Sequence, residues 1–307
     1  MVELAATLTD ELSRLVSVKT VLRRNEPLDR RTTLRVGGKA DAYVEPASED
    51  DLAAVLGWCS QRGVPHFVLG RGSNLLVRDG GIRGVVICLA QPMFSEVTVE
   101  GERLRCGAGA KLKVVATEAR RAGLAGLEFL EGIPGSVGGG LRMNAGAMGS
   151  WMFKVVECVR AMTERGAIVE LKGETMGAAY RSCELLRTRI ALQAVLRGEA
   201  SARREIEERT QAYNAKRWQS QPAAPSAGCV FKNPSSIPAG KLVEELGLKG
   251  FRVGGAVISE VHGNFIVNEG GAKAGDVLRL IGMVQERARL ARGIELETEL
   301  EIVGERG

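Results

Sequence analysis

Aromatic residues and histidines are scarce in this chain of 307 residues. Phe, Trp and Tyr together make up 4% of it, and there are only two histidines, His66 and His262. So few aromatic side chains leave few platforms on which nucleobases can stack, and the basic residues form only short pairs such as Arg23-Arg24. Two histidines this far apart in the sequence do not suggest a metal site. We therefore expect no nucleic-acid partner and no metal.

Cysteine pairs and long apolar runs are absent as well. The six cysteines are widely spaced and form no Cys-x-x-Cys pair, so we expect mostly reduced core thiols at Cys59, Cys88, Cys106, Cys158, Cys183 and Cys229. No stretch approaches the roughly 18 apolar residues of a membrane span. The N-terminal segment lacks a basic region that leads into an apolar run, which argues against a secretory signal. These absences favour a cytoplasmic protein without a membrane partner or an obligate protein partner.

Glycine, by contrast, is abundant. The chain has 39 glycines, roughly twice the usual frequency of about 7%. Glycine adopts positive φ angles easily and lets a backbone approach a ligand closely, so the surplus is typical of a protein that holds a phosphate or a flat cofactor on loops. The content of 45% hydrophobic and 26% charged residues is that of an ordinary globular protein of about two domains. The net charge of +5 suits anionic metabolites.

The first third of the chain predicts a β-α-β unit. An amphipathic helix is expected over Leu4–Val18, a strand over Ala42–Pro46, a helix capped by Ser48, and a second, buried strand over His66–Leu69. A glycine loop follows this second strand. In the dinucleotide-binding fingerprint of the Rossmann fold the glycines lie between the first strand and the helix, so that fold is disfavoured.

The rest of the chain alternates between strand, helix and loop patterns. The expected elements are short antiparallel strands within Gly84–Ala110, a helix over Lys113–Ala122, an irregular stretch over Gly126–Gly149, strands over Val155–Met162 and Ile190–Leu196, a helix over Ser201–Arg217, a strand over Phe265–Val267, a helix over Ala274–Arg292 and a strand over Leu296–Val303. A long irregular stretch inside a compact domain is usually functional.

Two glycine loops carry the main chemical signal. The first, Gly70-Arg71-Gly72-Ser73-Asn74, offers backbone N–H groups, a hydroxyl, an amide and a guanidinium that can bind a diphosphate. The second runs from Gly132 to Gly146 and combines a proline of fixed φ with many glycines. One such loop is often a plain turn, whereas two in one domain favour a cofactor cradle.

Four ordered motifs resemble one family. TLRVGG at 33–38, GRGSNLLV at 70–77, GLEFLEGIPGSVGGGLRMNAGAMG at 126–149 and SAGCVFKNP at 226–234 are similar to those of the UDP-N-acetylenolpyruvoylglucosamine reductases. The resemblance spans about Thr33 to Val303. It implies an α+β fold in which two α+β subdomains bind FAD in the manner of the vanillyl-alcohol-oxidase class and a C-terminal α+β domain covers the substrate. The expected domains are residues 1–20 (a helix), 21–200 (subdomains of about 21–83 and 84–200) and 201–307.

The resemblance also implies cofactors and a reaction. Non-covalent FAD and NADPH are expected to reduce the enolpyruvyl group of UDP-N-acetylglucosamine enolpyruvate to UDP-N-acetylmuramate, a step of peptidoglycan precursor synthesis. The FAD-binding residues carried over from the motifs are Arg35, Val36, Gly70, Arg71, Gly72, Ser73, Asn74, Leu75, Ile133, Pro134, Gly135, Ser136, Gly138, Gly139, Asn144, Ala145 and Gly146.

Further positions follow from the same motifs. The family's substrate-binding positions match Tyr180, Lys216, Arg217, Lys232 and Asn233. The catalytic positions match Arg181, Cys229 and Glu299. At Cys229 this chain departs from the many members that have serine as the proton donor. Glu297 stays open as an alternative to Glu299. Side chains two positions apart on a strand face the same side, so only motif position favours Glu299.

The chemistry of the reaction determines which roles these side chains must fill. Reduction of a vinyl carbon pair takes a hydride at one carbon and a proton at its neighbour, and negative charge spreads into the adjacent carboxylate. Arg181 suits stabilisation of that charge, and a protonated Glu299 suits a hydrogen bond to the same carboxylate. A thiol with a pKa of about 8.5 is mostly protonated at neutral pH, so Cys229 suits proton donation.

Two other functions remain open from the sequence. One is an FAD-dependent oxidase of the same cofactor fold. Such oxidases usually bind FAD covalently through histidine or cysteine, and neither histidine lies in a glycine loop. The other is a non-catalytic flavin-binding protein. The short spacing between Arg181 and Cys229 resembles the subclass that lacks an additional tyrosine-bearing substrate loop.

Overall fold

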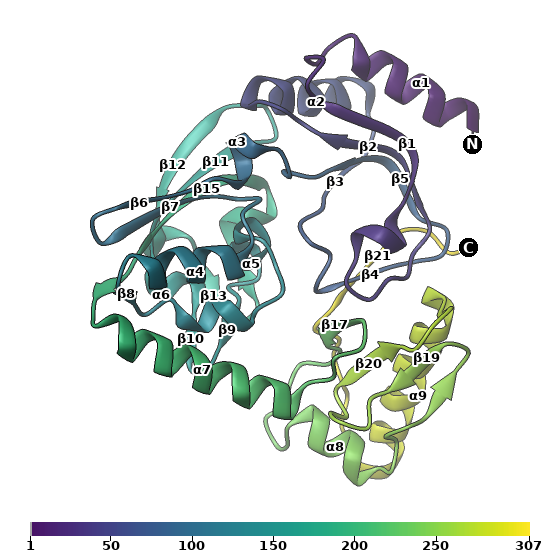
Figure 1. Cartoon of the computed structure of the whole chain (residues 1–307). Coiled ribbons are helices and arrows are strands. Elements are labelled where there is room, and N and C mark those ends of the chain that lie inside the picture. Colours follow the sequence, from purple (N-terminus) through teal and green to yellow (C-terminus); the bar gives the residue numbers. More distant parts are fainter. Residues whose placement is uncertain (1) are drawn as a thin grey trace. The chain divides into compact units, whose positions relative to one another are not determined.

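The structure, a computed structural model, describes residues 2–307, with side chains from Thr7 onward, and Met1 lies outside this range. The chain forms two compact units. Unit 1 comprises Met1–Asn25, Asp41–Arg71 and Gly84–Arg217, and unit 2 comprises Glu26–Ala40, Gly72–Arg83 and Trp218–Gly307. These units differ from the division expected at residue 200, because two early segments fold with the C-terminal part. The mixture of helices and strands confirms the α+β class (Figure 1).

The N-terminal sheet has the strand order β1-β2-β5-β3, formed by β1 (Val21–Pro27), β2 (Lys39–Glu45), β5 (Ile82–Ile87) and β3 (His66–Val68). The predicted strand, cap and helix after Ala42 are confirmed, since the Ser48 hydroxyl accepts a hydrogen bond from the Asp51 N–H (3.0 Å) at the start of α2 (Glu49–Arg62). The prediction that β3 is buried was wrong. It is an edge strand beside β5, and both His66 and Val68 are exposed.

The leading helix α1 (Val2–Ser13) is confirmed but ends earlier than expected. Leu8 and Leu12 are buried in the core of unit 1, whereas Val18 is fully exposed. Val16, beyond the end of the helix, still packs against this core from a non-helical segment.

A five-stranded antiparallel sheet forms the rest of the framework of unit 1. Its order is β12 (Ile168–Lys172), β11 (Val156–Thr163), β15 (Arg189–Arg197), β7 (Arg103–Gly107) and β6 (Val97–Glu100). Along β7 the exposed Arg103 and Arg105 alternate with the buried Leu104 and Cys106, as expected for a sheet with one face in the core. The strands predicted within Gly84–Ala110 are confirmed for β6 and β7, but β5 joins the other sheet and pairs in parallel with β3.

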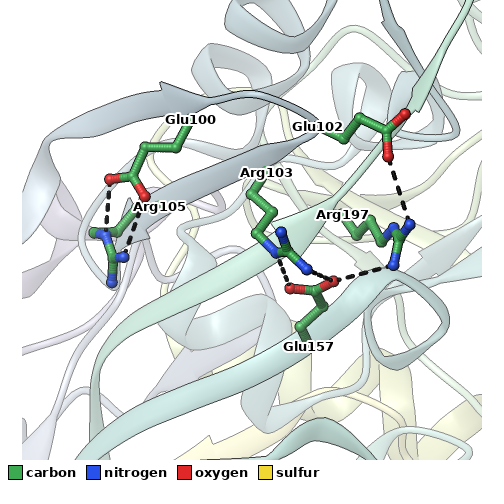
Figure 2. Close-up of polar contacts among 6 residues, drawn as sticks. All are labelled: Glu100, Glu102, Arg103, Arg105, Glu157 and Arg197. Carbon is green, nitrogen blue, oxygen red and sulfur yellow. Dashed lines mark hydrogen bonds and ion pairs between the residues drawn. The ribbon is translucent and has the colours of Figure 1, made fainter.

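The other face of this sheet carries a network of ion pairs (Figure 2). Arg103 and Arg197 lie directly opposite each other on β7 and β15, an unfavourable pairing of like charges. Glu157 on β11 accepts from Arg103 at 2.5 Å and lies 3.6 Å from Arg197, while Glu102 lies 3.5 Å from Arg197. These carboxylates offset the repulsion between Arg103 and Arg197 on the exposed face of the sheet. The core packs against the other face.

Loops and short elements cover the buried side of the sheet. The helix expected over Lys113–Ala122 is confirmed as α4 (Leu112–Arg121). The prediction that Gly126–Gly149 lacks regular structure was wrong, because it contains η2 (Glu128–Gly132) and the short helix α5 (Val137–Arg142), whose N-cap is Ser136. The remaining short elements of unit 1 are α3 (Pro92–Ser95), β8 (Leu124–Ala125), β9 (Gly146–Ala147), β10 (Ser150–Trp151), α6 (Met152–Val155), η3 (Gly173–Thr175), β13 (Ala178–Ala179), β14 (Ser182–Cys183), η4 (Glu184–Arg187) and β16 (Glu199–Ala200). The expected helix after residue 200 is α7 (Arg203–Ser220).

Unit 2 is built on a second antiparallel sheet with the order β17 (Ser226–Cys229), β20 (Phe265–Asn268), β19 (Ala256–Ile258) and β18 (Arg252–Val253). The helix α9 (Ala274–Arg292), predicted with these bounds, packs against β18 and β19 (Figure 1). Its residues Leu280 and Val284 are buried in the core of unit 2. The shorter helices are η1 (Leu28–Arg31) and α8 (Ala239–Glu245).

A pair of parallel strands ties the early segment of unit 2 to its end. β4 (Leu75–Val77) pairs with β21 (Glu301–Val303), so the strand expected over Leu296–Val303 is confirmed only for its last three residues. None of the six cysteines, all within the described part of the chain, forms a disulfide, and three of them are buried. Among residues 2–307 no helix is both long enough and apolar enough to cross a membrane.

Candidate functional site

The two predicted glycine loops approach each other in unit 1. A Cβ atom built on Gly70 would lie 2.9 Å from the Ser136 Oγ atom, so a larger residue at position 70 would collide with the second loop. Ser136 itself caps α5, and its Oγ atom accepts a hydrogen bond from the Gly139 N–H (3.4 Å). Glycine is needed here because the chain passes so close to a side chain.

Glycines also let α5 pack tightly on the sheet. The Gly138 N–H donates to the Ala108 carbonyl at 2.7 Å, and a Cβ on Gly138 would lie 3.2 Å from Ala108. Pro134 and Gly139 stay exposed on the outer side of the loop. Backbone that is held firmly on one side and accessible on the other fits a cofactor whose phosphates need oriented N–H groups. The residues present in unit 1 therefore fit their expected part of an FAD site.

The second glycine loop also contacts the residue that precedes Tyr180 and Arg181. The Asn144 side chain accepts a hydrogen bond from the Phe153 N–H (3.2 Å) and donates one to the Ala179 carbonyl (3.1 Å), immediately before Tyr180 and Arg181. Arg181 has a φ of 55°, unusual for a non-glycine residue, and its guanidinium lies 5.2 Å from the centre of the exposed Tyr180 ring. Unit 1 thus brings a predicted cofactor loop next to a predicted catalytic arginine.

Helix α7 presents Lys216 and Arg217. Lys216 is exposed, whereas Arg217 is half-buried, and desolvation by burial lowers the pKa of its guanidinium. The Nη1 atom of Arg217 lies 3.3 Å from the Cβ position of Gly132, at the start of the second glycine loop. The arginine is therefore held beside the loop.

A carboxylate that the sequence analysis missed holds α7 in this place. Glu128 is buried, accepts a hydrogen bond from the Gly126 N–H (2.8 Å) and pairs with Arg209 of α7 at 3.0 Å. Arg209 and Arg217 are eight residues apart, about two helical turns, so they point to similar sides of the helix. A glutamate inside the apolar run Leu127–Leu130 was the available signal.

In unit 2 residues 33–38, the Arg35 loop, lie against the later part of the first glycine loop. The Thr33 N–H donates to the Gly72 carbonyl (3.2 Å), and Gly72 has a φ of 58° with the Arg31 carbonyl oxygen 2.7 Å from its Cβ position. The Asn268 side chain donates to the carbonyls of Leu34 (3.1 Å) and Arg35 (3.2 Å). The backbone of Arg35 is therefore fixed, while its side chain is exposed.

Four of the predicted cofactor residues are buried, namely Val36, Gly72, Leu75 and Ser136. Val36 and Leu75 are buried, so any contact with a cofactor would use their backbone atoms. Ser73 and Asn74, which lie between Gly72 and Leu75, are half-buried.

The Cys229 and Glu299 segments run side by side in unit 2. Cys229 is half-buried at the end of β17, after Gly228 at a φ of 78°. The Glu299 N–H donates to the Val230 carbonyl (2.8 Å). The Asn74 side chain donates to the Glu299 carbonyl (3.1 Å), so the first glycine loop joins the same group. The Thr33 hydroxyl donates to the Ser226 carbonyl (2.7 Å) and links the Arg35 loop to it.

The environments of Glu297 and Glu299 differ. Glu297 has a side chain 74% exposed and binds the Lys232 ammonium at 2.8 Å, and the hydrogen bond from Lys232 lowers the pKa of Glu297. Glu299 is half-buried. The expected strand geometry was wrong, since Thr298 forms only an isolated bridge with Phe231. A predicted substrate residue, Asn233, uses its side-chain oxygen to accept the Ala239 N–H (3.0 Å) at the start of α8.

The predicted catalytic residues divide by unit. Arg181 belongs to unit 1, and Cys229 and Glu299 belong to unit 2. The substrate candidates divide in the same way, with Lys232 and Asn233 in unit 2 and the others in unit 1.

Comparison with known proteins adds an independent line of evidence. The model of the FAD binding domain family matches residues 40–172, and that of the C-terminal domain of UDP-N-acetylenolpyruvoylglucosamine reductase matches residues 221–303. The reductase of Heliobacterium modesticaldum is 46% identical over 287 residues, 92% of this chain and 91% of that protein. The Bacillus subtilis reductase is 45% identical over 283 residues, 91% of this chain and 93% of that protein.

A solved structure is similar as well. The crystal structure of the reductase from Thermus caldophilus has a TM-score of 0.81 and 39% sequence identity, and the match covers 93% of this chain and 99% of that chain.

Proposed function

The chain belongs to the family of UDP-N-acetylenolpyruvoylglucosamine reductases, and we propose that it reduces UDP-N-acetylglucosamine enolpyruvate to UDP-N-acetylmuramate with FAD and NADPH. The product is a peptidoglycan precursor, which fits a site of action in the cytoplasm. The observation that supports this function most directly is the backbone hydrogen bond between Glu299 and Val230, which holds the glutamate beside the cysteine segment. The proposal rests on this contact together with the family motifs.

The backbone of the two glycine loops and that of the Arg35 loop would hold FAD non-covalently. When bound, FAD supplies the hydride for one vinyl carbon of the substrate. The close approach of Gly70 to Ser136 and the firm seat of Gly138 on Ala108 support this assignment. NADPH is the reductant that restores the cofactor.

The side chains act on charge and proton. Arg181 stabilises the negative charge that spreads into the substrate carboxylate, and Glu299 hydrogen-bonds the same carboxylate. Cys229 gives its thiol proton to the carbon next to the one that receives the hydride, so the C=C bond gains both atoms. Tyr180, Lys216, Arg217, Lys232 and Asn233 bind the remainder of the anionic substrate.

Two half-reactions test the proposal. The purified protein should be yellow, should lose its flavin absorbance under anaerobic NADPH, and should regain it when the enolpyruvyl substrate is added. If the absorbance does not return, the substrate assignment is wrong. Rapid return with O₂ alone would support the oxidase instead. A flavin that NADPH does not reduce would support a non-catalytic flavin-binding protein.

Two variants of Cys229 test the proton donor. Cys229→Ala should keep flavin reduction by NADPH and lose product formation, because no acidic hydrogen remains at that position. Cys229→Ser restores a proton donor and should stay active. Normal turnover by Cys229→Ala would refute this role.

A further inference from the structure

The segment that follows Cys229 is bonded along both edges. On one edge the Val230 carbonyl accepts the Glu299 N–H (2.8 Å), and the Lys232 N–H donates to the Glu297 carbonyl (2.9 Å). On the other edge the Val230 N–H donates to the Asn264 carbonyl (2.9 Å). The segment is therefore a short central strand, although its neighbour on one side is not a regular strand.

Asn264 continues this ladder with its side chain. Its Oδ1 atom accepts the Phe231 N–H (2.8 Å), and its Nδ2 atom donates to the Phe231 carbonyl (2.8 Å). One side-chain amide thus replaces both groups of a backbone partner. Asn264 is 2% exposed and Phe231 is also 2% exposed, so water does not compete for these bonds.

The ladder is irregular at this point, which makes the side chain necessary. Cys229 pairs with Phe265 and Ser226 pairs with Val267, so β17 has one residue more than β20 over this interval. Gly228, in the left-handed region, absorbs the extra residue. A bulge leaves the next residues free to shift in register unless another contact fixes them.

We infer that Asn264 is a positioning residue that sets Cys229 against Glu299 for protonation of the substrate. By clamping Phe231, it fixes the two residues after the cysteine, and Val230 carries that placement to Glu299. This inference rests on the proposed function. It predicts an effect on the half-reaction that uses Cys229 and none on the half-reaction that does not.

The first test is Asn264→Ala in the FAD-loaded enzyme, followed by stopped-flow absorbance. Flavin reduction by NADPH should stay within about twofold of wild type. Reoxidation by the enolpyruvyl substrate should slow by about 10- to 100-fold, the scale of a misplacement of about 1 Å. Equal slowing of both half-reactions would overturn the inference, as would unchanged reoxidation.

Asn264→Asp supplies a conservative variant with a pH signature. A neutral carboxyl at this position accepts the Phe231 N–H and donates to the Phe231 carbonyl, whereas the anion directs a lone pair at that carbonyl. Burial raises the pKa of such a carboxyl, so a larger share of it is neutral as the pH falls. The rate of flavin reoxidation in Asn264→Asp, relative to that in wild type, should therefore rise as the pH falls. A ratio that does not change with pH would contradict the inference. If Asn264→Ala does not retain FAD, this series decides.

A matched control separates placement from stability. Val284 is 1% exposed in the core of unit 2, in α9. Val284→Ala should lower the melting temperature and leave both half-reactions unchanged. If both Asn264 variants fail to fold, the residue serves the stability of unit 2 and the inference is wrong. If the substrate does not reoxidise the flavin of the wild-type enzyme, the proposed function is wrong. If the substrate reoxidises the flavin of wild type and of Asn264→Ala at the same rate, only the inference is wrong.

Discussion

Replacing Glu299 and Glu297 one at a time by alanine tests which carboxylate serves the reaction. The hydrogen bonds that tie residue 299 to Val230 and Asn74 use its main-chain N–H and carbonyl, so alanine retains them. We therefore expect Glu299→Ala to fold. Loss of a group that stabilises developing charge costs about 10²- to 10³-fold in kcat, or about 3 to 4 kcal/mol of barrier.

Glu297→Ala is the matched control, two residues away. Its side chain is exposed and pairs only at the surface with Lys232, an interaction that contributes little. We expect kcat to stay within about twofold of wild type, because an exposed ion pair is weak. The comparison uses kcat rather than KM for the substrate, because Glu297→Ala also removes the ion pair of Lys232, a predicted substrate-binding residue.

The assay is steady-state kcat with saturating substrate, followed by stopped-flow reoxidation of the reduced flavin. In Glu299→Ala only the second half-reaction should slow. If Glu297→Ala loses activity while Glu299→Ala keeps it, the motif-based choice between the two glutamates is wrong.

Three further predictions concern folding and reactivity. Burial alone would raise the pKa of Asp51, but hydrogen bonds from Ser17, Thr20 and Ser48 outweigh it and hold the pKa below its ordinary value. Asp51→Asn should therefore lower the unfolding free energy measured in urea at pH 7 by about 2 kcal/mol. This difference should shrink as the pH falls below about 4 and through the folded pKa of Asp51. The same change at the exposed Asp50 should cost under about 0.5 kcal/mol. Glu128→Gln weakens the contact with α7 and should raise KM for the substrate more than it lowers kcat, and an unchanged KM would speak against this. Burial raises the pKa of Cys59 to about 11, so peptide mapping after alkylation at pH 8 should find this thiol unmodified in the folded protein and modified after unfolding.

Long periodic segments were readable from the sequence. The helix Ala274–Arg292 is long enough for its helical period to identify it, and the strands around Val159 and Ala194 are identified by their runs of apolar residues. The three consecutive glycines of α5 have poor helix propensity. This helix exists because Gly138 packs on Ala108, a contact that only the fold creates. The exposure of β3 was also unreadable, since it depends on which strand forms the edge of the sheet.

In the candidate site, too, some features could be predicted from the sequence and others arise only from the fold. Motifs selected Cys229 and Glu299, and the structure places their segments side by side. The amides that hold these segments, Asn74 and Asn264, contact backbone atoms that are 225 and 33 residues away. Such contacts have no sequence period, and a buried asparagine cannot be distinguished from a loop asparagine by its neighbours alone.

The pairing of β4 with β21 links the proposed cofactor loop to the proposed catalytic glutamate within unit 2. Leu75 lies opposite Glu301, so Asn74, the last polar residue of the first glycine loop, reaches the Glu299 carbonyl. A shift of one residue would turn every side chain of the short strand to the other face and break this contact. The proposed cofactor loop and the proposed catalytic glutamate therefore share one register. A variant such as Asn74→Ala should consequently weaken both FAD retention and the substrate half-reaction, and loss of only one of them would show that the two are not joined here.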